Sequence, residues 1–162
     1  MRITALLTIA AIIGCINSVV VQIDLVENPQ SELNAVHPVN IKDVVMIKLA
    51  ENPTTGYTWV LVNREANSQA LKFSKKEYFP ANHQDDIFGA GGIKYYNFLA
   101  QQSGADSLDF IYCQVFAMEK FYDSETGHFD ISSALAQNMP INHFNLKFDV
   151  KPEPALESAF LN

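Results

Sequence analysis

The stretch that decides the fold is residues 43–62, which read DVVMIKLAENPTTGYTWVLV. Its first part, Asp43–Leu49, and its last part, Tyr57–Val62, place apolar side chains at every second position. A period of two is typical of a strand with one buried face. Between the two parts the chain must bend sharply, because Pro53 fixes its own φ and Gly56 permits a positive φ. The stretch therefore predicts two strands joined by a tight turn.

The rest of the chain carries the same kind of strand signal and shows no long helical period. Asn142–Val150 is the clearest case, since every second side chain in it is apolar from Phe144 onward. Short alternating strands separated by turn residues predict an all-β fold, an antiparallel β-sandwich, with Trp59 as an anchor of its core. The other expected strands are Val19–Val26, Leu71–Tyr78, Ile93–Ala100 and Asp106–Phe116.

Two segments do not follow this pattern and are predicted as connections. Gln30–Asn40 is mixed in character, and Pro38 argues against a continuous strand there because proline cannot donate a backbone hydrogen bond. Ala117–Ile141 is the longest connection. Within it, Ile131–Gln137 could form one or two helical turns, although no convincing N-cap precedes it.

Length and charge narrow the classes of partner. The chain has 162 residues, which suits one domain, and its 48% apolar content is enough for a core. The net charge is −7 and the isoelectric point is about 4.9. Nucleic acids and anionic membrane surfaces are both bound through lysine and arginine, so we expect neither as a partner. A partner attracted by charge should be neutral or basic.

Residues 1–18 have the pattern of a secretory signal peptide. Arg2 supplies the positive start, and Ala5–Ile13 is, apart from Thr8, an apolar run too short to span a bilayer. Small and polar residues follow it. We expect cleavage after Ser18. The folded domain then covers residues 19–162, and its last eight residues form a loose tail.

The N-terminal segment also sets the expected location of the protein. A cleaved signal peptide implies a protein that is secreted or held in the secretory and endolysosomal pathway. The alternative is that Ile12-Ile13-Gly14-Cys15 is a bacterial lipoprotein cleavage box, in which case Cys15 would carry a lipid anchor.

No motif for catalysis, metal binding or cofactor binding is present. Cys113 lies in a predicted strand, where a buried structural cysteine is far commoner than a nucleophile. The histidines lack the spacing of a zinc site, and no Gly-x-Ser-x-Gly elbow occurs. We therefore expect no enzyme activity, no metal and no cofactor. The four histidines are His37, His83, His128 and His143.

Two polar loops invite a functional interpretation. Residues 52–56 have no side chain that would dock in a core, so the loop tip should be exposed, either as a well-made turn or as a binding loop. Gly89-Ala90-Gly91-Gly92 lacks the third spaced glycine and the following helix of a nucleotide-binding loop, so we expect no nucleotide binding. It is either a flexible hairpin end or a loop whose backbone approaches a partner closely.

Taken together, three segments resemble the chagasin family, which are protein inhibitors of papain-like cysteine peptidases. The resemblance runs in order from about Asp43 to Val150 and implies an immunoglobulin-like β-sandwich with three inhibitory loops at one end. The segments are Asn52-Pro53-Thr54-Thr55-Gly56 followed by an aromatic residue, Gly89-Ala90-Gly91-Gly92 preceded by Lys76–Pro80, and a late strand ending in Tyr112.

The resemblance also implies roles for the loops. Pro53, Thr54, Thr55 and Gly56 would enter the centre of the peptidase cleft, nearest its catalytic thiol and histidine. Gly89–Gly92 would line one flank of the cleft through close backbone contact. The partner would be a papain-like cysteine peptidase, inhibited reversibly and without a covalent bond, and we expect the inhibitor to be a monomer.

The third loop departs from the family pattern of Arg-Pro followed by an aromatic residue. The aligned residues here are Gln114, Val115 and Phe116, so the aromatic ring is kept while the arginine's donors and the proline's rigidity are lost. We expect inhibition with an altered strength or target range, and an added contact from Glu119–Phe129 would compensate. The alternative function is a secreted immunoglobulin-like binding or adhesion module without inhibitory activity.

Overall fold

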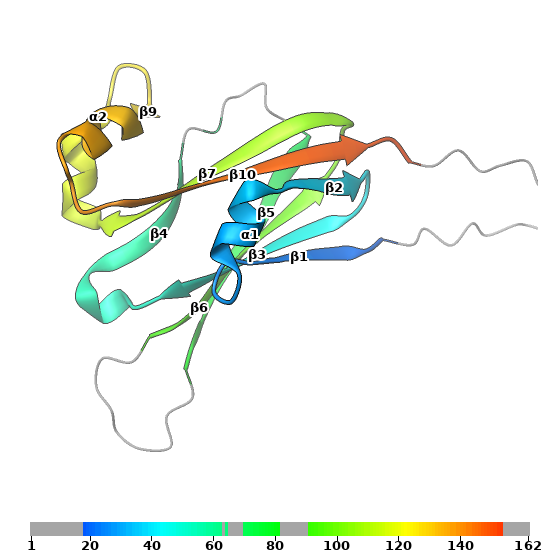
Figure 1. Ribbon diagram of the computed structural model, residues 1–162, viewed down its shortest axis with the longest axis horizontal. Helices are drawn as coiled ribbons and strands as arrows, with labels where there is room; N and C mark the ends of the chain where they lie inside the picture. The colour runs from blue at the N-terminus through cyan, green and yellow to red at the C-terminus, as the bar shows by residue number, and fades with distance from the viewer. Residues whose placement is uncertain (1–17, 63, 65–69, 82–90, 154–162) are drawn as a thin grey trace, which may run out of the picture.

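The computed structural model describes residues 18–62, 64, 70–81 and 91–153, and in it two four-stranded β-sheets lie face to face (Figure 1). The strand order is β1-β3-β6-β5 in one sheet and β2-β10-β7-β4 in the other. The first sheet contains β1 (Val20–Asp24), β3 (Val44–Glu51), β6 (Gly92–Ala100) and β5 (Leu71–Pro80), and the second contains β2 (Val36–Asn40), β10 (Asn142–Lys151), β7 (Gly104–Gln114) and β4 (Tyr57–Val62).

Short elements connect these strands. The helix α1 (Pro29–Asn34) precedes β2, and the 3-10 helix η1 (Pro53–Thr55) joins β3 to β4. Between β7 and β10 lie the 3-10 helix η2 (Val115–Lys120), the strands β8 (Tyr122–Asp123) and β9 (His128–Phe129), and the helix α2 (Ile131–Ala136). Residues 1–17 of the predicted signal peptide and the predicted C-terminal tail lie outside the described residues. None of the helices that are described is long and apolar enough to cross a bilayer.

Alternate side chains of the two sheets meet in one core, as the period-two pattern predicts. Val45, Ile47 and Leu49 of β3 are fully buried together with aliphatic and aromatic residues of β6, β7 and β10. Trp59 of β4 is 5% exposed, and its ring lies 4.7 Å from that of Phe144. The structure therefore confirms the β-sandwich and the place of Trp59 in its core.

The two strands nearest the N-terminus correct the expectation of purely antiparallel sheets. β1 pairs with β3 and β2 pairs with β10 in parallel, whereas β3–β6, β5–β6, β7–β10 and β4–β7 are antiparallel. The chain crosses between the sheets after β1 and again after β2. Neither strand is therefore joined to its neighbour by a hairpin, which is the connection that would enforce antiparallel pairing.

Two prolines lie within strands, although a break in each strand was predicted there. Pro38 lies inside β2 opposite Asp149, and β5 continues through Phe79 and Pro80, where it was predicted to stop. Both strands are at sheet edges. An edge strand has one neighbour, so a residue without an N–H is tolerated where its nitrogen faces away from that neighbour.

Residues 115–141, which we call the insertion, fold against the sandwich rather than forming an open loop. A second apolar cluster joins Val62, Ile111 and Cys113 of β4 and β7 to Phe121 and Ile141 of the insertion. These strand residues alternate with those in the main core, so the insertion covers the other face of the sheet. β7 therefore ends at Gln114, and the last two residues of the predicted strand, 115 and 116, begin η2 instead.

The helix predicted at 131–137 is present as α2, and it has the N-cap that the sequence analysis did not recognise. The Asp130 carboxylate accepts a hydrogen bond from the Ser133 amide at 2.9 Å. Such a cap satisfies one of the free amides at a helix start and stabilises it by about 1 kcal/mol.

Cys113 is a free, fully buried thiol beneath the insertion, as expected for a structural cysteine. Burial raises the pKa of the Cys113 thiol above its ordinary value, which keeps it protonated and unreactive.

The Cys113 thiol should therefore report on docking of the insertion. Phe121→Ala removes a large side chain from the cluster around Cys113, which should destabilise the insertion by about 3 kcal/mol and speed alkylation of Cys113. Phe79→Ala, at an exposed position on β5, is the matched control and should leave the rate unchanged. The measurement is alkylation by iodoacetamide, followed by peptide mass. Equal rates in both variants would mean that the insertion does not shield the thiol.

Candidate functional site

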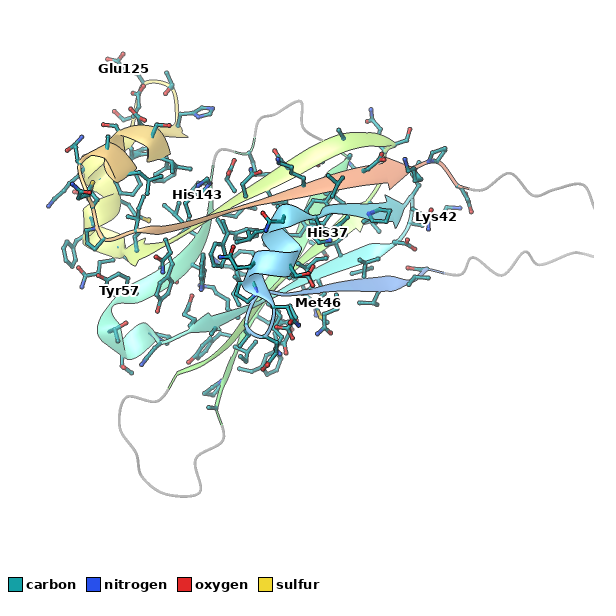
Figure 2. All side chains as sticks on the ribbon, in the orientation of Figure 1. His37, Lys42, Met46, Tyr57, Glu125 and His143 are labelled. Carbon is teal, nitrogen blue, oxygen red and sulfur yellow. The ribbon has the colours of Figure 1, made fainter. Side chains whose placement is uncertain are left out.

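The strand registers bring the predicted loops to one end of the sandwich. Gln114, at the end of β7, pairs with Tyr57, which follows Gly56. Gly92, at the start of β6, pairs with Glu51, which precedes Asn52. Figure 1 shows η1 and η2 at this end, opposite the start of β1 and the end of β10, and Figure 2 places Tyr57 here and Lys42 at the other end. Two of the predicted loop residues, 89 and 90, lie outside the described residues.

The loop Asn52–Gly56, which we call the wedge loop, is tied together by its own hydrogen bonds. The Asn52 side chain accepts from the amide and hydroxyl of Thr54, at 3.3 and 2.7 Å. The hydroxyl of Thr55 donates to the Asn52 carbonyl at 2.7 Å. Gly56 has φ of 77° and donates its amide to the Pro53 carbonyl at 3.0 Å. The threonine hydroxyls thus close the turn, while the residues from 53 to 56 are exposed as predicted.

A buried ion pair beneath the wedge loop joins three strands. The Glu51 carboxylate lies 2.9 Å from the Lys94 ammonium, with side chains only 5% and 11% exposed. The same carboxylate accepts from the Trp59 amide at 2.8 Å and from the Thr58 hydroxyl at 3.0 Å. Since Glu51 ends β3, Lys94 is in β6 and Trp59 is in β4, this cluster fixes the strands on which two of the loops are mounted.

Neither member of this pair could be identified from the sequence. A glutamate and a lysine 43 residues apart form no motif. Only the pairing of β3 with β6, which sets Glu51 opposite Gly92, brings them together. Tyr96 adds to the cluster by donating its hydroxyl to the Trp59 carbonyl at 2.6 Å. Burial, and to a smaller extent the Glu51 charge, raises the pKa of Tyr96, so this hydroxyl stays a donor.

Tyr112 of β7 supports the wedge loop from the sheet that contains β4. Its hydroxyl accepts from the Asn52 amide at 3.4 Å, and its ring lies 5.0 Å from Trp59 and 5.3 Å from Tyr57. The loop is therefore held from below by β7 as well as by the ion pair.

The two described glycines of the Gly89–Gly92 segment are required by crowding within the chain. A Cβ on Gly92 would lie 2.3 Å from the Phe79 carbonyl oxygen, and one on Gly91 would lie 2.9 Å from the Glu51 carbonyl oxygen. Both contacts are with backbone and cannot be relieved by a side-chain movement. These glycines thus let the backbone at the start of β6 approach the backbones of β5 and of the end of β3 closely.

The third predicted loop presents apolar surface. Val115 and Phe116 are 58% and 68% exposed, while Gln114 is half-buried at the end of the strand. Exposed large apolar side chains at the rim of a loop cluster are typical of a surface that binds another protein.

The described part of this end offers contact surface and no reactive group. Of the described histidines, His37 packs on Phe148, His143 contacts the Asp109 carboxylate at 2.7 Å, and His128 is exposed in β9. His83 lies outside the described residues. No group of three metal-ligating side chains occurs among the residues that the structure describes. The arrangement is suited to binding by shape.

Comparison with known proteins gives a family and a fold. The family model described as chagasin family peptidase inhibitor I42 matches residues 38–131, more than half of the chain. Chagasin of Trypanosoma cruzi is 26% identical over 76 residues, which cover 46% of this chain and 67% of chagasin.

Two solved structures share the fold. The crystal structure of the cysteine protease inhibitor EhICP2 from Entamoeba histolytica has a TM-score of 0.52 at 14% identity, covering 83% of this chain and 98% of that one. The solution structure of amebosin has a TM-score of 0.50 at 21% identity, with the same coverage. These similarities confirm the predicted immunoglobulin-like β-sandwich.

The ion pair should hold the wedge loop in place. Glu51→Gln leaves the Lys94 ammonium buried without its anion, and loss of one partner of a buried pair costs about 3–5 kcal/mol. We expect a matching loss in the free energy of unfolding and faster hydrogen exchange at the Thr55 and Gly56 amides, measured by NMR.

The control is Asp106→Asn, which breaks the ion pair between the buried Asp106 carboxylate and the half-buried Arg64 at the other end of the sandwich. This variant should also unfold more easily but should keep the exchange rates of the wedge loop. Equal protection of the loop amides in the two variants would show that Glu51 stabilises the fold without positioning the loop.

Proposed function

The chain belongs to the chagasin family of peptidase inhibitors, which are not enzymes, and from that membership we propose that it inhibits papain-like cysteine peptidases. The observation that carries the proposal is the wedge loop, an exposed turn braced by its own hydrogen bonds at the point where the three loops meet. Such a loop can enter a cleft without first becoming ordered.

In this proposal, inhibition is reversible and uses no covalent bond. A papain-like thiol attacks an extended peptide, whereas Pro53–Thr55 form a turn of 3-10 helix with the Thr55 amide bonded to the Asn52 carbonyl at 3.2 Å. The wedge loop therefore presents no extended bond to the thiol. Because the loop is already ordered, binding loses little conformational entropy.

Each loop has a proposed place on the peptidase. The wedge loop occupies the centre of the cleft, and the glycine segment around Gly91 and Gly92 lines one flank. Phe116 packs on an apolar wall at the other flank, which its 68% exposure allows. Gln114 cannot supply the charge or the forked donors of an arginine, so we expect a target range that differs from that of relatives with Arg-Pro.

We also propose that the chain is secreted and that its signal peptide is cleaved between Ser18 and Val19. The Val19 amide donates to the Asp43 carboxylate at 3.0 Å, and Asp43 is only 3% exposed. Cleavage would turn this amide nitrogen into an ammonium group beside a buried anion, which forms a stronger, charge-assisted hydrogen bond.

The inhibitory role predicts a specific loss of function at the wedge loop. Thr54→Glu with Thr55→Glu should weaken inhibition of a papain-type peptidase by at least ~30-fold, since blocking a central contact costs about 2 kcal/mol or more. The control is Gln102→Glu with Ser103→Glu, which adds the same charge at an exposed turn between β6 and β7.

Titration of the peptidase with each variant is the measurement, and the control should inhibit as the unchanged chain does. Unaltered inhibition by the folded Thr54/Thr55 variant would reject the wedge loop as the inhibitory element. A chain that inhibits no such peptidase at micromolar concentration would instead support the binding or adhesion module.

The proposed processing has its own test. The intact mass of the protein purified from its natural host should correspond to an N-terminus at Val19. A lipidated N-terminal Cys15 would overturn secretion and support a membrane anchor.

A further inference from the structure

We propose that the segment Pro140–Asn142, where the insertion returns to the sandwich, is a fourth contact element that receives an apolar side chain from the rim of the peptidase cleft. This inference rests on the proposed inhibitory function and adds a contact that none of the three loops provides. Its basis is a groove between this segment and the wedge loop.

The groove has a volume of about 430 Å³ and borders the wedge loop directly. It is lined by Thr55 and Tyr57, by Tyr112 of β7, and by Pro140, Ile141 and Asn142. The two tyrosine rings lie 5.3 Å apart. A groove lined by aromatic and aliphatic side chains together with a few polar groups is the usual form of a pocket for an apolar group.

A second groove lies beside the wedge loop, between it and the glycine segment. It has a volume of about 440 Å³ and is bordered by Asn52, Gly91, Gly92 and Ile93. Tyr112 lines both grooves. The wedge loop therefore stands between two hollows, one bordered by the glycine segment and the other by Pro140–Asn142.

The packing of the insertion fixes the second wall. Asn142 pairs with Tyr112 at the start of the β10–β7 ladder, and Ile141 is buried in the cluster that contains Cys113. The Ile141 amide donates to the Met139 carbonyl at 2.8 Å, and the Met139 amide donates to the Ala134 carbonyl at 3.0 Å. The segment is thus held in position before any partner binds.

The groove adjoins the wedge loop, so a peptidase bound to that loop is the protein that would fill it. Thr55 is exposed on that loop and also lines the groove, so a peptidase that seats on Thr55 lies directly beside the groove. The groove is large enough for a single leucine or aromatic side chain, and filling it removes apolar surface from water. Such a contact would stand in for the missing arginine at Gln114.

The test blocks the groove with a larger side chain at one of its lining positions. Asn142→Arg places a long charged side chain at an exposed groove position, and the matched control Ser132→Arg adds the same side chain at an exposed position of α2 outside the groove. We expect Asn142→Arg to weaken inhibition of a papain-type peptidase at least tenfold, mainly through faster dissociation, and Ser132→Arg to leave it unchanged. Circular dichroism shows whether both variants are folded.

A second readout does not depend on the strength of inhibition. A solvatochromic dye on Asn142→Cys should shift to shorter emission wavelength when the peptidase binds, and the same dye on Ser132→Cys should not, with the buried Cys113 left unlabelled. Unchanged inhibition by a folded Asn142→Arg variant, or no shift at residue 142, overturns the fourth contact while the three-loop proposal stands. An unchanged chain that inhibits no peptidase overturns both.

Discussion

The loop end of this molecule depends on one buried carboxylate. Glu51 ends β3, and its two carboxylate oxygens accept hydrogen bonds from the Lys94 ammonium of β6. One of them also accepts from the Thr58 hydroxyl and the Trp59 amide of β4. A charge removed from water is tolerated only when its partners are in place, so this arrangement admits few alternatives. The strand ends that carry the wedge loop and the glycine segment are consequently fixed relative to one another. This holds although β3 and β6 belong to one sheet and β4 to the other.

The insertion adds surface to the sandwich and is itself packed against one of the sheets. It brings its own apolar residues, chiefly Phe121 and Ile141, to a strand face that also bears apolar side chains. The sequence contains a trace of this arrangement, because β4 and β7 carry Val62 and Ile111 at positions facing away from the main core. Strands with apolar residues on both faces are expected where a second layer covers them, and a search for period-two alternation alone does not detect them.

The features that could be predicted from the sequence are those determined by a few neighbouring residues. The strand β3, the core position of Trp59 and the exposed turn at Asn52–Gly56 follow from local period and turn chemistry. The family resemblance added the sandwich type. The strand containing Pro38 was missed because its tolerance of proline depends on its place at a sheet edge, which no local window reports.

The Glu51–Lys94 pair was missed for a related reason, since it exists only through the register of two strands far apart in sequence. The cap of α2 was missed although it is local. Asp130 is a favoured N-cap residue directly before the helix, and the helix itself is a turn and a half, so its signal was weak.

The position of Cys113 has a chemical consequence for a protein of this kind. The described part of the chain contains one cysteine, a free thiol sealed under the insertion, and its rigidity comes from packing, strand pairing and buried charge. Thiol peptidases need a reduced active-site cysteine, so they work under reducing conditions, which open disulfide staples. A wedge loop braced by Asn52, Glu51 and Tyr112 needs no disulfide, so it keeps its shape under the reducing conditions that the proposed target would require.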